Sequence, residues 1–216
     1  RIVFKNLKTK GREGMRFVIA THNRKKLGEL QRILEPLGIQ AVTGEDIGIS
    51  LTEAAETGTT FEENAWIKAE SACRETGLPA VADDSGLMVD ALDGGPGVYS
   101  ARFAGEGATD EDRNRKLLRE LEAVPEEKRT AKFVSAVFPD GSRVETRGEC
   151  PGWVGFAPRG KDGFGYDPLF VVAQGLPGAG KTYAELTPEE KDAVSHRGNA
   201  LRHFSTLLQA YLDERK

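Results

Sequence analysis

Four polar stretches of the sequence carry the residue types that bind phosphate, hold metal ions or transfer protons. They cover residues 20–26, 56–68 and 82–86, together with the paired segments 163–168 and 195–198. Each falls at the end of an expected strand or helix, where proteins usually display functional side chains. These stretches are therefore the candidates for a functional site.

The first stretch, THNRKK, follows an apolar run and opens a helix. Thr21, Asn23 and Lys26 supply a hydroxyl, an amide and an ammonium group at the helix N-terminus, where free N–H groups and the helix dipole attract anions. This arrangement is typical of a triphosphate site. A polar helix start is also common as a plain cap on a solvated face, so the stretch alone leaves both interpretations open.

Carboxylates dominate the second and third stretches. Glu56 precedes a helix that carries Lys68, and Asp83 and Asp84 end a short apolar strand. Mg²⁺ prefers carboxylate oxygens together with water and substrate phosphate, so one or two carboxylates beside a phosphate site suffice to hold it. Asp83 and Asp84 should point to opposite faces of the strand and do different work. The alternative is an acidic Asx-type turn without a ligand.

The fourth stretch combines GFGYDP with SHRG. Glycines allow the backbone to approach a flat ligand, and Phe164 or Trp153 offers a ring to stack on a base. His196 and Arg197, at the start of the last helix, can donate hydrogen bonds to a carbonyl oxygen. The alternatives are that Phe164 is a core residue and Arg197 a partner in a surface ion pair.

Hydrophobic spacing and capping signals outline the elements that must position these stretches. Spaced leucines indicate a helix that ends before Gly38, and further helices open at Thr60, Thr109 and Thr187. Strands are expected over residues 15–20, 79–82, 131–138, 143–148 and 169–173. A last helix should carry on one face Leu201, Phe204, Leu207, Leu208 and Tyr211. This order predicts an α/β fold with a mixed central sheet flanked by helices and two lobes around a substrate cleft.

Composition narrows the class of protein. The 216 residues contain 30 Lys and Arg against 34 Asp and Glu, a net charge of −4, which gives no electrostatic case for a nucleic-acid polymer as partner. Cys73 and Cys150 are too few for a disulfide framework, and no secretory signal or membrane-length apolar run is present. We therefore expect a cytoplasmic protein in which residues 1–14 are a leader or added segment and residues 15–216 form a single domain.

One further motif competes with the four stretches. Residues 175–182 read GLPGAGKT, the spelling of the phosphate-binding loop of nucleotide hydrolases. Such a loop needs a helix that begins at its lysine, whereas Pro188 and the helix start at Thr187 follow too closely for that helix to form. No later strand is expected to supply a metal-binding aspartate. We interpret the match as accidental, with Lys181 in a flexible connection.

Together, the four stretches resemble the inosine/xanthosine triphosphate pyrophosphatase family. The similar segments are FVIATHNRKKLGEL, ETGTTFEENAWIKAESA, LPAVADDSGLMVDALDGGPGVYSARFAG, GFGYDPLF and AELTPEEKDAVSHRGNAL, and they span nearly the whole chain from Met15 to about Leu208. The resemblance implies a two-lobed α/β homodimer that uses Mg²⁺ to convert a purine nucleoside triphosphate into the monophosphate and pyrophosphate.

The resemblance also implies roles for individual residues. Asp84 becomes the catalytic base and, with Glu56, a ligand of Mg²⁺. The implied triphosphate and substrate contacts are Thr21, Asn23, Lys26, Lys68 and Ser85, and the implied nucleoside pocket consists of Phe164, Gly165, Tyr166, Asp167, Lys191, His196 and Arg197.

The resemblance thus implies an enzyme that removes ITP, dITP and XTP from the nucleotide pool. Discrimination against adenine would follow from recognition of the 6-oxo group by hydrogen-bond donors of the protein. The 6-amino group of adenine is itself a donor and would leave those donors without an acceptor. Two alternatives stay open: a kinase or ATPase built on residues 175–182, and a module that binds nucleotide without cleaving it. The presence of both Glu56 and Asp84 argues against the binding module, which needs no activated water.

Overall fold

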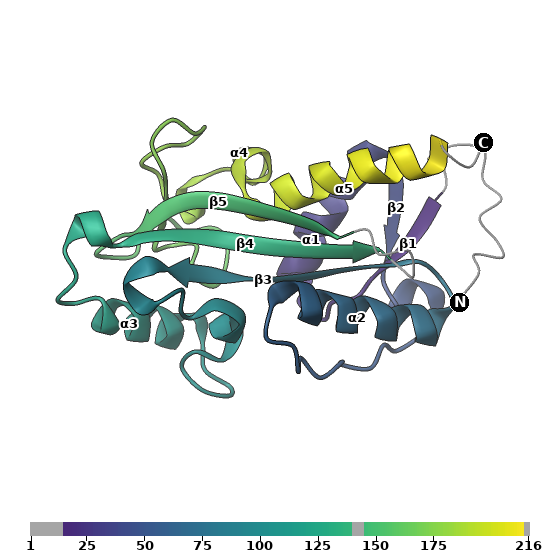
Figure 1. The fold of residues 1–216 in the computed structure, drawn as a ribbon, viewed down its shortest axis with the longest axis horizontal. Coiled ribbons are helices and arrows are strands. Elements are labelled where there is room, and N and C mark those ends of the chain that lie inside the picture. The colour runs from purple at the N-terminus through teal and green to yellow at the C-terminus, as the bar shows by residue number, and fades with distance from the viewer. Residues whose placement is uncertain (1–14, 140–144, 214–216) are drawn as a thin grey trace. The chain divides into compact units, whose positions relative to one another are not determined.

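The computed structural model describes residues 15–139 and 145–213, so the predicted leader and the turn after the fourth strand lie outside the described residues (Figure 1). The helices are α1 (Arg24–Leu34), α2 (Phe61–Thr76), α3 (Asp110–Glu120), α4 (Pro188–Val194) and α5 (His196–Asp213). The strands are β1 (Met15–Ile19), β2 (Ile39–Val42), β3 (Ala80–Val89), β4 (Thr130–Pro139), β5 (Thr146–Val154) and β6 (Phe170–Val172).

The six strands form one mixed sheet in the order β2-β1-β3-β4-β5-β6. β1 runs parallel to both β2 and β3, whereas β5 and β6 are antiparallel. The predicted α/β class with a mixed sheet and flanking helices is therefore confirmed. The chain divides into two compact units: the first comprises residues up to 84, 136–147 and from 200 onward, and the second comprises residues 85–135 and 148–199.

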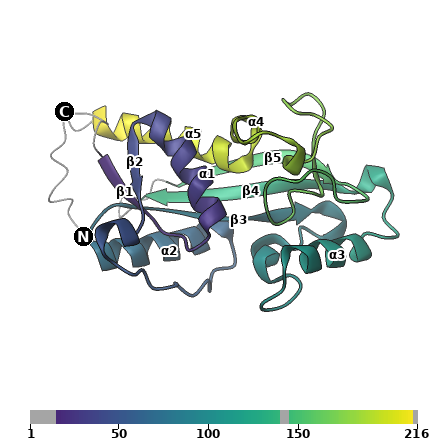
Figure 2. The same ribbon diagram turned by 180° about the vertical axis from the view of Figure 1, so that it is seen from behind.

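The core of the first unit covers both faces of its strands. On one face, Phe17 and Val81 pack with α1 and α5, and the rings of Phe17 and Phe204 meet edge to face at 5.9 Å. On the other face, Val18 and Ala80 pack against α2. Figures 1 and 2 both show α5 and α2 on opposite sides of the first half of β3. Odd-numbered residues at the start of β3 thus face α1 and α5, and even-numbered residues face α2.

The second unit has its own core, made of apolar residues from α3, β5, β6 and the second half of β3. Leu117 of α3 and Leu121, the residue that follows the helix, are fully buried in it, and the rings of Phe170 and Tyr183 lie 4.8 Å apart. This core is separate from the clusters of the first unit, which explains why each unit is compact by itself.

Local hydrogen bonds set the helix ends, as the sequence predicts. Thr60, Thr109 and Thr187 each form a capping box with the acidic residue three positions later. After α1, a short 3₁₀ turn ends at Gly38, whose φ of 75° favours glycine. Among the described residues, no helix is both long enough and apolar enough to cross a bilayer.

Three expectations about secondary structure are wrong in detail, and one strand has no counterpart among them. The strand expected over residues 79–82 is the ten-residue β3, and the one expected over 143–148 is β5, which continues to Val154. The sequence does not indicate β2, because this strand has only four residues, includes the exposed Gln40 and contains no long apolar run. Leu207 is 44% exposed and leaves the buried face of α5, while the side chain of Tyr211 lies outside the described part of the chain.

Candidate active site

Asp83 and Asp84 lie inside β3 of the first unit and are 1% and 6% exposed. They face opposite sides of the strand and meet different helices. Lys26 of α1 reaches Asp83 Oδ2 at 3.2 Å, and Lys68 of α2 reaches Asp84 Oδ1 at 2.7 Å. Burying a carboxylate is costly unless an opposite charge compensates it, so each lysine permits the strand to continue through its aspartate.

Lys68 also forms an ion pair with Glu56, so one ammonium group joins two carboxylates. Burial lowers the pKa of Lys68, but the attraction of Asp84 and Glu56 outweighs it, and the pKa lies above its ordinary value. Burial raises the pKa of Asp84 although Lys68 opposes the shift. The result is a charged lysine beside a carboxylate that is a stronger base than an exposed aspartate.

Asn64 is a member of this cluster to which the sequence assigned no role. It is fully buried, its Nδ2 donates to Asp84 Oδ2 at 3.4 Å, and its Oδ1 accepts from the N–H of Gly58 at 2.8 Å. A Cβ on Gly58 would lie 2.7 Å from that Oδ1, so only glycine fits. The available signal was the spacing of Asn64 and Lys68, which puts both on one face of α2.

Thr21 and Asn23 cap α1 in the structure. Asn23 Oδ1 accepts from the backbone N–H groups of Lys25 and Lys26 at 3.0 and 3.1 Å, and Thr21 Oγ1 accepts from the N–H of Asn23 at 3.2 Å. The capping interpretation left open by the sequence therefore describes their present contacts. Their role as triphosphate ligands stays a prediction.

In the second unit, a buried ion pair underlies the predicted nucleoside residues. Lys191 Nζ lies 2.6 Å from Asp167 Oδ2, and both side chains are almost fully buried. The same oxygen accepts from the N–H of Phe164 at 2.8 Å, and Lys191 Nζ lies 4.9 Å from the centre of the Phe164 ring. A Cβ on Gly163 would meet the Asp167 carboxylate, so this turn also requires glycine.

Arg197 adds a second cation near that ring. It is 2% exposed, its guanidinium lies 5.9 Å from the Phe164 ring centre, and its Nη2 donates to Ser85 Oγ at 2.9 Å. The buried ring of His196 stacks on Tyr183 at 6.1 Å. The structure thus groups these predicted residues within one unit and surrounds Phe164 with positive charge.

Tyr166 has a different surrounding from the one expected of a substrate contact. It is 4% exposed, and its hydroxyl donates to the carbonyl of Ser100 at 3.0 Å. Burial raises the pKa of Tyr166 well above its ordinary value, so the hydroxyl stays a donor. This contact ties the 164–167 turn to the 97–102 segment.

Residues 175–182 lack the geometry of a phosphate-binding loop. After Thr182 comes only a 3₁₀ turn, Tyr183–Glu185, and α4 begins at Pro188. Thr182 Oγ1 donates to the carbonyl of Arg159 at 3.0 Å, and Lys181 Nζ lies 3.5 Å from Glu190 Oε1 in a half-exposed ion pair. Within this described loop, no α-helix points its N-terminus at the glycines, which supports the interpretation of the motif as accidental.

The chain is similar to known proteins over most of its length. A model of the Ham1 family matches residues 17–207. The dITP/XTP pyrophosphatase of Nocardia farcinica is 52% identical over 203 residues, covering 92% of this chain and 97% of the relative. That of Geobacter sulfurreducens is 53% identical over 189 residues, with 86% and 92% covered. A solved HAM1 protein from Coxiella burnetii is 44% identical with a TM-score of 0.79, covering 91% of this chain and 99% of that one.

The fold and these sites define a mixed-sheet α/β protein with charged side chains buried in both of its compact units. The family match covers most of the chain, and the relatives are similar over nearly their whole length. The chain belongs to the Ham1 family.

Proposed function

We propose that the protein is a Mg²⁺-dependent pyrophosphatase that hydrolyses ITP, dITP and XTP to the monophosphate and pyrophosphate. The names of its relatives, dITP/XTP pyrophosphatases at 52% and 53% identity, support the substrate class. The observation that carries the proposal to this chain is the convergence of Asp84 and Glu56 on a single positive charge, the ammonium of Lys68.

That convergence fits a divalent cation. The Lys68 ammonium serves as a stand-in ion, since it shows that two carboxylates can share one cation at this position. Carboxylate oxygen is the donor that Mg²⁺ prefers. In the described part of the chain no group of three or more His, Cys, Asp or Glu side chains forms a metal site, so the remaining ligands would be water and substrate phosphate. Glu56 and Asp84 would hold the ion.

The residues of the first unit then have separate roles in the hydrolysis. Mg²⁺ supplies positive charge beside the phosphate oxygens when it is bound. Asp84 takes a proton from the water that attacks phosphorus. Lys26 and Lys68 neutralise the charge that develops as the bond between the α- and β-phosphates breaks and pyrophosphate leaves. Thr21 and Asn23 orient the start of α1 toward the triphosphate.

In the second unit, the proposed task is recognition of the nucleoside. Phe164 stacks on the purine, while Lys191, His196 and Arg197 place donors around it. Donors suit the 6-oxo group of hypoxanthine and xanthine and face the 6-amino group of adenine unfavourably, because a buried unpaired donor is costly. Four further residues contact the substrate or support the residues that do: Ser85, Gly165, Tyr166 and Asp167.

The test is product analysis with ITP, dITP, XTP, GTP and ATP in the presence of Mg²⁺. Pyrophosphate and the monophosphate are expected from the first three nucleotides. Orthophosphate as the first product would favour a kinase or ATPase reaction instead, and tight binding without turnover would favour a binding module.

The family resemblance also supports a homodimer in the cytoplasm. Light scattering of the purified protein at micromolar concentration tests the first expectation, and fractionation of the source cells tests the second. A monomer with full activity would remove the dimer from the proposal and leave the chemistry unchanged.

A further inference from the structure

Two side chains of α3 hold the backbone of Gly165, inside the predicted nucleoside segment of the second unit. The N–H of Gly165 donates to Asp110 Oδ2 at 2.8 Å, and the carbonyl of Gly165 accepts from Asn114 Nδ2 at 3.0 Å. Asp110 and Asn114 are four residues apart and lie on the same face of the helix. Both polar groups of one residue are thus fixed by one helix.

The Asn114 contact has a defined orientation. Asn114 is 8% exposed, and its Oδ1 has no hydrogen-bond partner among the residues that the structure describes. Turning the amide over would put that oxygen against the Gly165 carbonyl, so only the observed orientation makes a hydrogen bond. A buried asparagine that satisfies Gly165 and leaves its own acceptor unsatisfied is costly for stability alone, which suggests a functional reason for its presence.

The helix that carries these two residues is itself anchored at both ends. Arg113 pairs with Asp110 and donates to the carbonyls of Ala101 and Ala108. At the other end, Arg129 donates to the carbonyls of Leu121 and Val124 at 2.6 and 2.9 Å.

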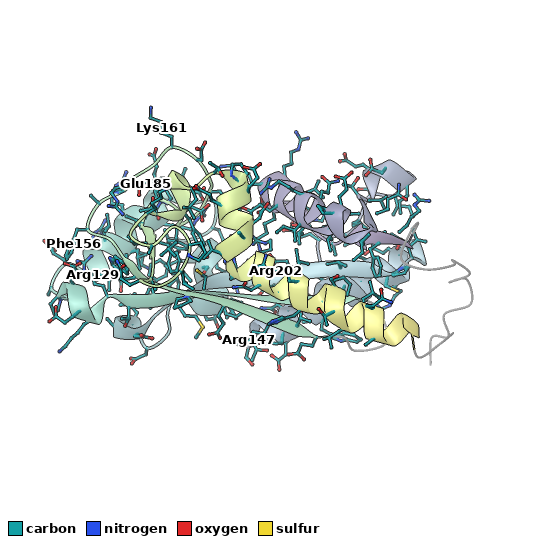
Figure 3. The ribbon with its side chains drawn as sticks, turned by 90° about the horizontal axis from the view of Figure 1, so that it is seen from above. Arg129, Arg147, Phe156, Lys161, Glu185 and Arg202 are labelled. Atoms are coloured by element: carbon teal, nitrogen blue, oxygen red, sulfur yellow. The ribbon has the colours of Figure 1, made fainter. Side chains whose placement is uncertain are left out.

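The side chain of Arg129 is covered in turn. Its guanidinium lies 4.0 Å from the centre of the Phe156 ring, and Figure 3 labels this pair at the edge of the second unit. Hydrogen bonds and ring contact therefore fix the C-terminal end of α3, and the helix offers a rigid base for the turn that it holds.

Gly165 is the neighbour of Phe164, whose own N–H is held by Asp167. The φ of Gly165 is 61°, a left-handed backbone conformation that favours glycine. The direction of the Phe164 ring depends on the orientation of the peptide between Phe164 and Gly165. Asp110 fixes the peptide that joins Phe164 to Gly165, and Asn114 fixes the peptide that follows Gly165.

We propose that Asp110 and Asn114 are positioning residues for purine recognition: they hold the Gly165 peptide and thereby aim the ring of Phe164. This inference rests on the proposed function. It extends the recognition site from the predicted nucleoside segments to a helix of which the sequence indicated only the start at Thr109.

Three variants and a matched control test the proposal. Asn114→Leu keeps the size of the side chain and removes the donor, and Asp110→Ala removes the acceptor. Asp110→Asn retains an oxygen that can accept from Gly165 and is the conservative rescue. Asp112→Ala is the control, because Asp112 caps the same helix through Thr109.

The rate of pyrophosphate release from ITP gives kcat and KM. Inhibition by inorganic tripolyphosphate measures phosphate binding alone, and a thermal melt measures the stability of the fold. Asn114→Leu and Asp110→Ala should raise KM for ITP about three- to tenfold, the worth of one hydrogen bond, with kcat and the tripolyphosphate inhibition constant nearly unchanged. Asp110→Asn should restore KM, and Asp112→Ala should lower Tm and leave KM alone.

An unchanged KM in folded Asn114→Leu and Asp110→Ala would overturn the inference, and so would an equal loss of tripolyphosphate inhibition. If Asn114→Leu does not fold, the comparison of Asp110→Ala with Asp110→Asn decides by itself. Absence of pyrophosphate release by the unchanged protein would instead overturn the proposed function and this inference with it.

Discussion

Lys68 Nζ lies 2.7 Å from Asp84 Oδ1, and both side chains are mostly withdrawn from solvent. The pair joins α2 to the middle of β3, and Glu56 contacts the same ammonium group. An ion pair in such a place contributes little net stability, because desolvation offsets the attraction. Its value lies in holding a base and a cation in fixed positions.

The change Asp84→Asn should reduce pyrophosphate release from ITP by about 100-fold or more, the usual worth of a general base. The amide is nearly isosteric with the carboxylate, so the strand should survive. It accepts a proton poorly and is a weaker Mg²⁺ ligand. Steady-state kinetics and calorimetric titration with ITP measure the two effects, and binding should persist because Lys26 and Arg197 are unchanged.

Asp83→Asn is the matched control, because Asp83 is equally buried but pairs with Lys26 on the opposite face of β3. Turnover near the unchanged rate in Asp84→Asn, with a large loss in Asp83→Asn, would move the base to Asp83. Loss in neither variant would exclude both carboxylates from proton transfer.

The change Lys181→Ala should reduce turnover only modestly, by less than about threefold, because its ion pair with Glu190 is a surface contact. In a true phosphate-binding loop the corresponding lysine touches the transferred phosphate, and its loss would be severe. Lys68→Met provides the contrast, with an expected loss of more than about tenfold in kcat/KM from the missing charge. Equal and severe losses in both variants would revive the kinase or ATPase alternative.

Sequence reasoning located the helices well because their ends depend on neighbours. Thr60, Thr109 and Thr187 bond to residues three positions away, so a short window contains the whole signal. The same holds for the rejection of residues 175–182, which depends on Pro188 nearby. Capping residues, turn residues and the spacing of leucines therefore suffice to predict the order of the elements and the fold class.

Contacts between distant residues explain what the sequence did not predict. Adjacent aspartates signal the end of a strand, yet β3 continues through them because Lys26 and Lys68, on two separate helices, compensate their charge. Asp110 and Asn114 gave no signal either, since the residue they hold lies 55 and 51 positions away. Such pairings become visible only once the packing of the elements is known.

The change Gly58→Ala should lower both stability and activity. The added Cβ would lie 2.6 Å from Glu63 Cβ and 2.7 Å from Asn64 Oδ1, and overpacking of this kind costs about 1–3 kcal/mol. Because Asn64 also contacts Asp84, its displacement should reduce kcat as well. Thermal melts and ITP kinetics measure the two effects.

Gly28→Ala is the control for that experiment. Gly28 lies within α1, and a Cβ there would meet nothing within 4 Å. Alanine should therefore stabilise the helix by about 0.5–1 kcal/mol and leave kcat unchanged. Equal Tm values for the two variants would show that the space around Gly58 can adapt to a side chain.

The last prediction concerns acid stability. Glu63 accepts hydrogen bonds from the N–H and hydroxyl of Thr59, the residue before its N-cap, and Glu190 accepts one from the N–H of its N-cap Thr187. These contacts hold the pKa of each carboxyl below its ordinary value of 4.5. The unfolded chain loses these contacts and binds protons more readily. The stabilisation is therefore complete above the ordinary pKa and is lost as the pH falls through the lower pKa of the folded state.

Tm should accordingly decline below about pH 4.5, and the double change Glu63→Gln with Glu190→Gln should flatten that decline. Glutamine keeps an oxygen that accepts from the cap but does not titrate, so the capping contact survives while its pH dependence is removed. Glu189→Gln, in the same first turn of α4, is the control and should leave the slope close to that of the unchanged protein. Melts recorded between pH 3 and 6 decide the matter: identical slopes for the double variant and the unchanged protein would mean that other carboxylates govern acid unfolding.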